Sequence, residues 1–286
     1  MNKINRRVFI AVTSSSVAAL TFGDLFAAAK AKDIPLGFQT WPIKEILGKD
    51  IPGTLKTMSG MGYKLIEMCY PKAYEKIGFG PFVQYKGSEL KKMFSDAGLI
   101  CPSCHFNTRD LTSDDANLDE AIQWSKDVGL KHMILSTFWI QNGTLNDYMI
   151  AAYKLNKAAE KVKAAGMQTA FHNHSFEFVQ LDGKLVYDAL LERFDPKIVK
   201  MQFQTEVINL GYKASDYFKK YPGRFVSAHL SDWTTEKKQV PIGQGLIDWN
   251  EFFANAKTGG VETFFVEMNF ETYKPSAEYI LKTVRM

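Results

Sequence analysis

Met167-Gln-Thr-Ala-Phe-His-Asn-His174 is a short apolar run that ends in two histidines. Three more runs end on a polar side chain able to bind a metal: residues 99–104 lead to His105, 224–228 to His229 and 263–266 to Glu267. Polar groups at the carboxyl ends of successive parallel strands converge in few architectures, of which the β/α barrel is the commonest. These strand ends therefore predict an enzyme, or a relic of one.

The regions around these runs repeat one pattern, in which an apolar run is followed by an amphipathic helix and a glycine. Strands are expected at 35–40, 64–68, 99–105, 132–138, 167–172, 198–204, 224–229 and 263–267. Helices are expected at 51–61, 87–97, 117–128, 145–165, 185–193, 214–221, 249–256 and 275–284. Eight strands alternating with helices predict an α/β fold, a single (β/α)8 TIM barrel over residues 32–286. Glycines that stop helices recur before most strands, at Gly62, Gly98, Gly129, Gly166, Gly223 and Gly260.

The first 31 residues differ in character from the rest. Arg6 and Arg7 precede Phe9 and a weakly apolar stretch, and small residues near Ala29 suit a signal peptidase. Paired arginines at this place resemble the twin-arginine export signal. The alternatives are an ordinary secretory signal and an amphipathic N-terminal helix. We expect residues 1–31 to be an export signal peptide and the mature protein to be periplasmic or otherwise exported.

The charge balance bears on the class of partner. Lys and Arg total 35 and Asp and Glu 31, which gives a formal charge of +4 spread along the chain. The sequence has no basic stripe of the kind that binds nucleic acid, and the mature part has no run long enough to span a membrane. A small-molecule partner is expected, and a homo-oligomer remains open. Cys69, Cys101 and Cys104 are an odd set, which favours buried thiols over a disulfide framework.

Several polar residues are candidates for chemistry. His172 and His174 alternate on an extended chain and so face the same side while the strand lasts. They could equally be two core histidines that bond backbone carbonyls, but a third histidine two strands away favours a functional site. Glu267 follows an apolar run, where a carboxylate needs a metal or an ion pair, for example with Arg224. Glu67 is its counterpart on the second strand. Asp232 could bond a neighbouring loop or orient a ring nitrogen of a ligand.

Four segments together resemble the xylose isomerase-like, sugar phosphate isomerase/epimerase superfamily. They are Phe171-His-Asn-His-Ser-Phe-Glu-Phe178, Tyr221-Pro-Gly-Arg-Phe-Val-Ser-Ala-His-Leu-Ser-Asp232, Pro241-Ile-Gly-Gln-Gly-Leu-Ile-Asp-Trp249 and Phe265-Val-Glu267. Each is weak alone, but the order and spacing match over essentially the whole mature chain. The resemblance implies a barrel that holds a divalent ion with residues of strands 5 to 8.

Carried over residue by residue, the resemblance implies the metal ligands His172, Gln204, His229 and Glu267. His172 stands where many members have glutamate, and Gln204 where the family has aspartate. Two negative charges are lost, which favours Zn or Mn over Mg, or no metal at all. Ser231 and Gln244 also replace the usual lysine and glutamate of two motifs, which weakens the expectation of standard epimerase chemistry.

The leading hypothesis is a sugar isomerase or epimerase that acts on an unphosphorylated or keto carbohydrate by proton abstraction beside a carbonyl. Glu67 or His174 is the expected base, His105 faces the sugar hydroxyls and Glu267 holds the metal. Stacking on the sugar, or packing in the core or rim, is expected of Phe38, Trp41, Trp139 and Trp233. Two alternatives remain: a 3-keto-glycoside lyase or hydrolase, and a non-catalytic periplasmic sugar-binding protein on a degenerate barrel.

Overall fold

The computed structural model describes residues 36–283. The expected export signal, residues 1–31, lies outside the described residues. Eight parallel strands close into a barrel in the order β1-β12-β9-β8-β5-β4-β3-β2. Their bounds are β1 Leu36–Gln39, β2 Leu65–Cys69, β3 Ile100–Phe106, β4 His132–Leu135, β5 Gln168–His172, β8 Val199–Gln204, β9 Phe225–Leu230 and β12 Thr263–Val266. The predicted eight-stranded barrel is confirmed.

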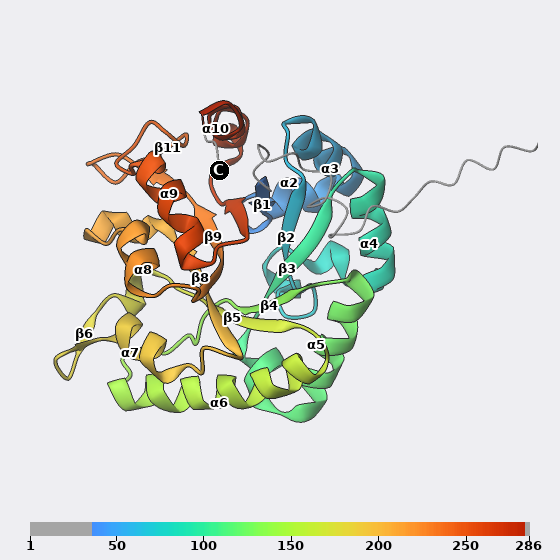
Figure 1. The fold of residues 1–286 in the computed structure, drawn as a ribbon. Coiled ribbons are helices and arrows are strands. Elements are labelled where there is room, and N and C mark those ends of the chain that lie inside the picture. Colours follow the sequence, from blue (N-terminus) through green and yellow to red (C-terminus); the bar gives the residue numbers. More distant parts are fainter. Residues whose placement is uncertain (1–35, 284–286) are drawn as a thin grey trace, which may run out of the picture.

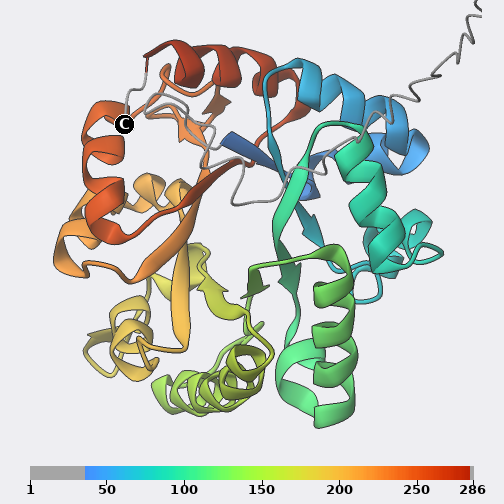
Figure 2. The same ribbon diagram turned by 45° about the vertical axis from the view of Figure 1, so that its right-hand side comes forward.

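Helices surround the strands as an outer ring, which Figure 2 shows most clearly. They are α2 Lys44–Lys49, α3 Ile51–Gly60, α4 Gly87–Asp96, α5 Asp115–Val128, α6 Leu145–Ala164, α7 Val186–Arg193, α8 Ala214–Lys220, α9 Trp249–Gly259 and α10 Phe270–Thr283. In Figure 1 the colours run in order around this ring, as expected when each strand is followed by its own helix. Within residues 36–283 no helix is both long enough and apolar enough to cross a membrane.

Local sequence explains where the helices begin and end. The Asp114 side chain accepts a hydrogen bond from the backbone N–H of Asn117 and so caps α5. The same helix ends at Gly129, whose φ of 90° lies in the left-handed region that glycine adopts most easily. The last helix was predicted to start at Pro275. That prediction is wrong: α10 starts at Phe270 and carries Pro275 inside it.

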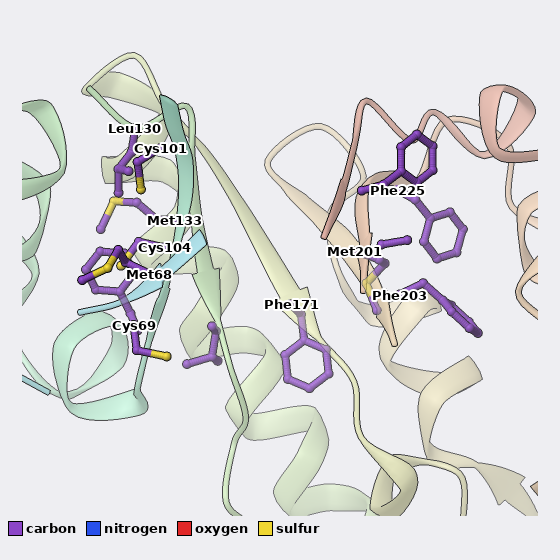
Figure 3. Close-up of a cluster of buried hydrophobic side chains, with 14 of the residues drawn as sticks. Met68, Cys69, Cys101, Cys104, Leu130, Met133, Phe171, Met201, Phe203 and Phe225 are labelled. Carbon is purple, nitrogen blue, oxygen red and sulfur yellow. The ribbon is translucent and has the colours of Figure 1, made fainter. Parts of the chain in front are cut away.

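The apolar core lies between the strands and the helices. Figure 3 shows buried apolar side chains of this core, among them Met68, Cys104, Phe171 and Met201. All three cysteines are free and buried, as the sequence predicted. Gly37 of β1 reflects close packing inside the barrel, because a Cβ there would lie 2.5 Å from the Phe265 ring.

The short elements at the carboxyl ends of the strands shape the rim. Two hairpins lie there, β6 Gln180–Leu181 with β7 Lys184–Leu185, and β10 Asp232–Trp233 with β11 Gln239–Val240. Short 3₁₀ helices also follow strands: η1 Trp41–Ile43, η2 Glu75–Ile77, η3 Gly80–Phe82, η5 Ser175–Glu177 and η6 Thr205–Leu210. The turn η4 Arg109–Ser113 is a π-helix, a rare form that is frequent at functional sites.

Candidate active site

The carboxyl ends of the strands open into a cavity of about 720 Å³. Its lining comes from the loops after β1 to β5, β8, β9 and β12. Among the predicted site residues, the lining includes His105, His172, His174, Gln204, Glu267, Trp41, Trp139 and Trp233. A cavity of this size at this end of a barrel is the expected place for a substrate.

Glu67 lies beneath this cavity, wholly buried among hydrogen-bond donors. One carboxylate oxygen accepts from Ser103 Oγ and from Gln202 Nε2 at 2.8 Å. The other oxygen bonds Gln39 Nε2 at 2.9 Å and the His229 ring. Burial alone would raise the pKa of Glu67, but His105 and His229 hold it well below its usual range. Because β2 and β8 are not neighbours in the barrel, these bonds cross its interior.

His229 lies between two carboxylates, with its Nε2 facing Glu67 and its Nδ1 2.9 Å from Glu267 Oε2. Both partners accept, so both ring nitrogens donate and the ring carries a charge. Burial opposes that charge, yet Glu267 and Glu67 raise the pKa of His229 to about 10. Glu267 Oε2 also accepts from Gln204 Nε2 at 2.6 Å. Glu267 is therefore paired with His229 and Gln204, not with Arg224.

Two further histidine rings pack against His229, and a third packs against one of these two. His105 stacks on it at 5.1 Å between ring centroids, and His172 lies 4.5 Å away. His174 contacts His172 edge-on and stacks on Phe176. Burial and the neighbouring imidazoles hold the pKa of His172 well below its usual range, and burial lowers that of His174 to about 4. Both rings are therefore neutral near pH 7 and able to bind a metal or accept a proton.

Two observations test whether these residues suit a divalent ion. One nitrogen from each of His105, His172 and His229 can be chosen so that all three lie within 4.8 Å of one another. The buried His172 Nδ1 has no hydrogen-bond partner among the described residues. Imidazole nitrogens together with a carboxylate such as Glu267 are typical ligands of zinc. The residues present therefore fit a metal, and His229, which carries a charge in this structure, would have to lose one ring proton to bind it.

Comparison with known proteins places this architecture in a family. Residues 55–286 match the family described as xylose isomerase-like TIM barrel. The chain belongs to this family. No curated protein sequence matches the chain.

Solved structures resemble this xylose isomerase-like barrel in fold. A sugar phosphate isomerase/epimerase from Parabacteroides distasonis is 23% identical, with a TM-score of 0.73 over 90% of this chain and 96% of that one. An L-ribulose 3-epimerase is 15% identical, with a TM-score of 0.63 over 87% and 93% of the two chains. The IOLI protein, solved with a bound zinc atom, is 16% identical, with a TM-score of 0.63 over 87% and 95%.

The aromatic residues of this family member divide between the core and the cavity. Phe38 is buried against Tyr63 and Tyr273, so of the two roles expected of it the structure shows packing in the core. Its side chain faces the helices because alternate strand residues point to opposite sides of the barrel. Trp233 lines the cavity and is partly buried, and its Nε1 donates to Ser231 Oγ at 3.0 Å. Trp41 and Trp139 stay 37% and 69% exposed.

Asp232 fixes the loop that follows the β10–β11 hairpin. Its buried carboxylate accepts from the backbone N–H of Gly243 and Gly245 and from Trp249 Nε1, all at 2.9–3.0 Å. A Cβ on Gly245 would lie 2.2 Å from an Asp232 oxygen, which explains the glycine. Of the two roles considered for Asp232, the structure shows the loop contact.

The structure brings most of the predicted site residues together but places two of them lower. Glu67 and His229 lie under the cavity rather than on its surface. Residues that the sequence analysis did not single out complete their surroundings: Gln39, Ser103 and Gln202. The sequence could have indicated the last two, because Ser103 and Gln202 lie two positions before His105 and Gln204 and so point to the same side of their strands.

Proposed function

We propose that this barrel is a metal-assisted sugar isomerase or epimerase that removes a proton beside a carbonyl of an unphosphorylated or keto sugar. The observation that carries the proposal is the meeting of neutral His172 and His174 with Glu267, Gln204 and His229 at one end of the cavity. Metal ligands, a proton acceptor and a carbohydrate-sized space are then adjacent, as this chemistry requires.

Each residue has a definite role in the proposal. His172, Gln204, His229 and Glu267 would hold the divalent ion, with Zn or Mn favoured by the histidines and the amide. When bound, such an ion polarises the carbonyl and stabilises the negative charge that forms as the proton leaves. Glu67 fixes the orientation of His229 through its Nε2, the way a carboxylate commonly supports a ligating histidine.

Proton transfer is assigned to His174 in preference to Glu67. His174 lines the cavity, and its Nδ1 has no hydrogen-bond partner among the residues described. Both carboxylate oxygens of Glu67 already accept hydrogen bonds, and Glu67 does not line the cavity. His105 lines the cavity beside His172, where it can bond a sugar hydroxyl. Its Nε2 lies 2.7 Å from Gln202 Oε1.

Solvent exchange tests the proton abstraction. A panel of keto-sugars and aldoses incubated in heavy water should gain deuterium at one carbon, and His174→Ala should slow this by about 10²–10⁴-fold. His132→Gln is the matched control, because His132 is a buried histidine at the start of β4, away from the cavity. If several sugars bind but none exchanges, the protein is a sugar-binding protein instead.

Metal content tests the ligand set. Protein prepared without chelator should hold about one divalent ion per chain, and Glu267→Gln should lower that occupancy sharply, since a small ligand set rarely compensates for a loss. Glu177→Gln is the control, a buried glutamate that does not line the cavity. Unchanged occupancy in Glu267→Gln would remove Glu267 from the ligand set.

We also propose export, on the strength of Arg6, Arg7 and Phe9. Replacing both arginines by lysine should leave the precursor in the cytoplasm, as fractionation with an antibody would reveal. Normal export of that variant would reject the twin-arginine route while leaving ordinary secretion possible.

A further inference from the structure

The residues that line the cavity include two unlike groups. One group, from β3, β5, β8 and the residue after β12, consists of histidines, Gln204 and Glu267. The loops after β1, β2 and β4 instead contribute Trp41, Ile77 and Trp139. These three side chains are 37%, 49% and 69% exposed, although each is large and apolar. Exposed apolar groups gathered in one cavity, rather than scattered singly, indicate a binding surface.

The aromatic group is held in place by ring contacts and hydrogen bonds of its own. The Trp41 ring stacks on Phe79, meets Tyr74 edge-on and carries Lys44 Nζ 4.5 Å from its centre. The Tyr74 hydroxyl bonds Ser136 Oγ at 2.6 Å, which joins the β2 loop to the β4 loop. Trp41 is thus held in place before any ligand arrives, which lowers the entropy cost of binding.

Trp139 is held in an unusual backbone conformation. Its φ is 54°, in the left-handed region that bulky residues avoid, and its N–H donates to Thr137 Oγ1 at 3.0 Å. The indole lines the cavity and stays 69% exposed, so packing against the described residues does not explain this backbone conformation. Backbone strain of this kind concentrates at ligand clamps and active sites.

We infer that the substrate is a glycoside, whose reacting sugar lies at the histidines and whose second ring stacks on an outer subsite formed by Trp41, Ile77 and Trp139. This inference rests on the proposed function and names the substrate class. The cavity volume of about 720 Å³ supports it, because pockets of about 300–1,000 Å³ suit drug-sized ligands rather than one sugar ring. With its anomeric carbon in a glycosidic bond, such a substrate carries its carbonyl on another ring carbon.

Binding measured by calorimetry tests the outer subsite without relying on turnover. The probes are methyl glycosides, phenyl glycosides and disaccharides of glucose, galactose and mannose, in both anomers. Two-ring probes should bind more tightly than the matching methyl glycoside. Trp139→Asn and Trp41→Ala should each reduce that advantage by about three- to tenfold, the size of one aromatic contact. Asparagine is chosen at 139 because it tolerates the left-handed backbone.

Tyr153→Ala serves as the control, because Tyr153 is a 51% exposed aromatic on α6 outside the cavity. Phenyl glycosides and disaccharides distinguish an aromatic second ring from a sugar ring. Equal affinity for one-ring and two-ring probes, or an advantage that survives both tryptophan variants, would overturn the inference while leaving proton exchange on single sugars intact. Tight glycoside binding without exchange of any keto-glycoside would instead uphold the subsite and overturn the proposed reaction. Failure of every glycoside probe to bind would overturn the inference alone, because proton exchange on keto-sugars and aldoses tests the proposed reaction separately.

Discussion

Glu67 and Glu177 are both wholly buried glutamates at the active end of the barrel, yet their surroundings differ completely. Glu67 receives side-chain donors on both oxygens and contacts His229. Glu177 accepts one backbone N–H, from His174 at 2.7 Å, and its Oε1 has no hydrogen-bond partner among the described residues. The pKa of Glu67 is held well below its usual range, whereas burial raises that of Glu177 to about 8.

The difference teaches that burial alone does not decide whether a carboxyl group is charged. Removing a carboxylate from water disfavours its charge in both places. At Glu67 the neighbouring His105 and His229 more than offset that cost, so the group stays ionised. At Glu177 the backbone N–H groups offset it only in part, so the group holds its proton at neutral pH. Glu67 can therefore stabilise a charged imidazole ring, and Glu177 cannot.

The largest expected effect comes from removing Glu67. In Glu67→Ala the charged His229 keeps only one carboxylate partner. The side-chain amides of Gln39 and Gln202 lose the acceptor to which they donate in the wild type. Breaking a buried ion pair in this way costs about 3–5 kcal/mol of unfolding free energy. Urea denaturation of the variant measures it. Glu67→Gln keeps the shape without the charge and should fall in between. A loss below about 1 kcal/mol in Glu67→Ala would contradict the charged assignment of this cluster.

The second effect is a stabilisation: Glu177→Gln should raise the free energy of unfolding, by an amount that depends on pH. The folded pKa of about 8 lies above the ordinary value of 4.5, so between these values the folded protein binds a proton that the unfolded chain releases. Stability contributed by this group is therefore complete below pH 4.5 and is lost as the pH rises to about 8. Glu177→Gln removes this loss.

The measurement is the unfolding free energy of wild type and Glu177→Gln from pH 4 to 9. The variant should gain about 1.4 kcal/mol relative to wild type for each pH unit between 4.5 and about 8. Parallel curves for the two proteins would show that Glu177 is ionised when folded, like Glu67.

The smallest effect is expected at the surface. Glu120 pairs with Lys72, and each side chain is 52% exposed. Water solvates both charges when the pair is broken, so Glu120→Gln should change the unfolding free energy by less than about 0.5 kcal/mol at any pH between 5 and 9. The same denaturation series measures it. A change above about 1 kcal/mol would show that solvent does not screen Glu120 and that this exposed carboxylate behaves like the buried Glu67 and Glu177.

Much of the fold was predictable because its signals are local. Apolar runs, helical periods and stop glycines such as Gly129 each act within one turn of chain. The start of α10 was not, because tertiary packing of Tyr273 and Ser276 overrides the usual preference of Pro275 for a first turn. The role of Phe38 stayed open between sugar stacking and core packing for a related reason: an aromatic residue near a strand end can face either side.

The sequence by itself determined that polar side chains gather at the carboxyl ends of eight strands, because strand period and strand order follow from short-range patterns. It also placed His172, His174, Gln204 and Glu267 at that end. Only the tertiary structure decided their states. Glu67 and His229 lie 162 residues apart in the chain and meet through the barrel interior. Charge, protonation and access to the cavity depend on such distant partners and on burial, which no local stretch of sequence specifies.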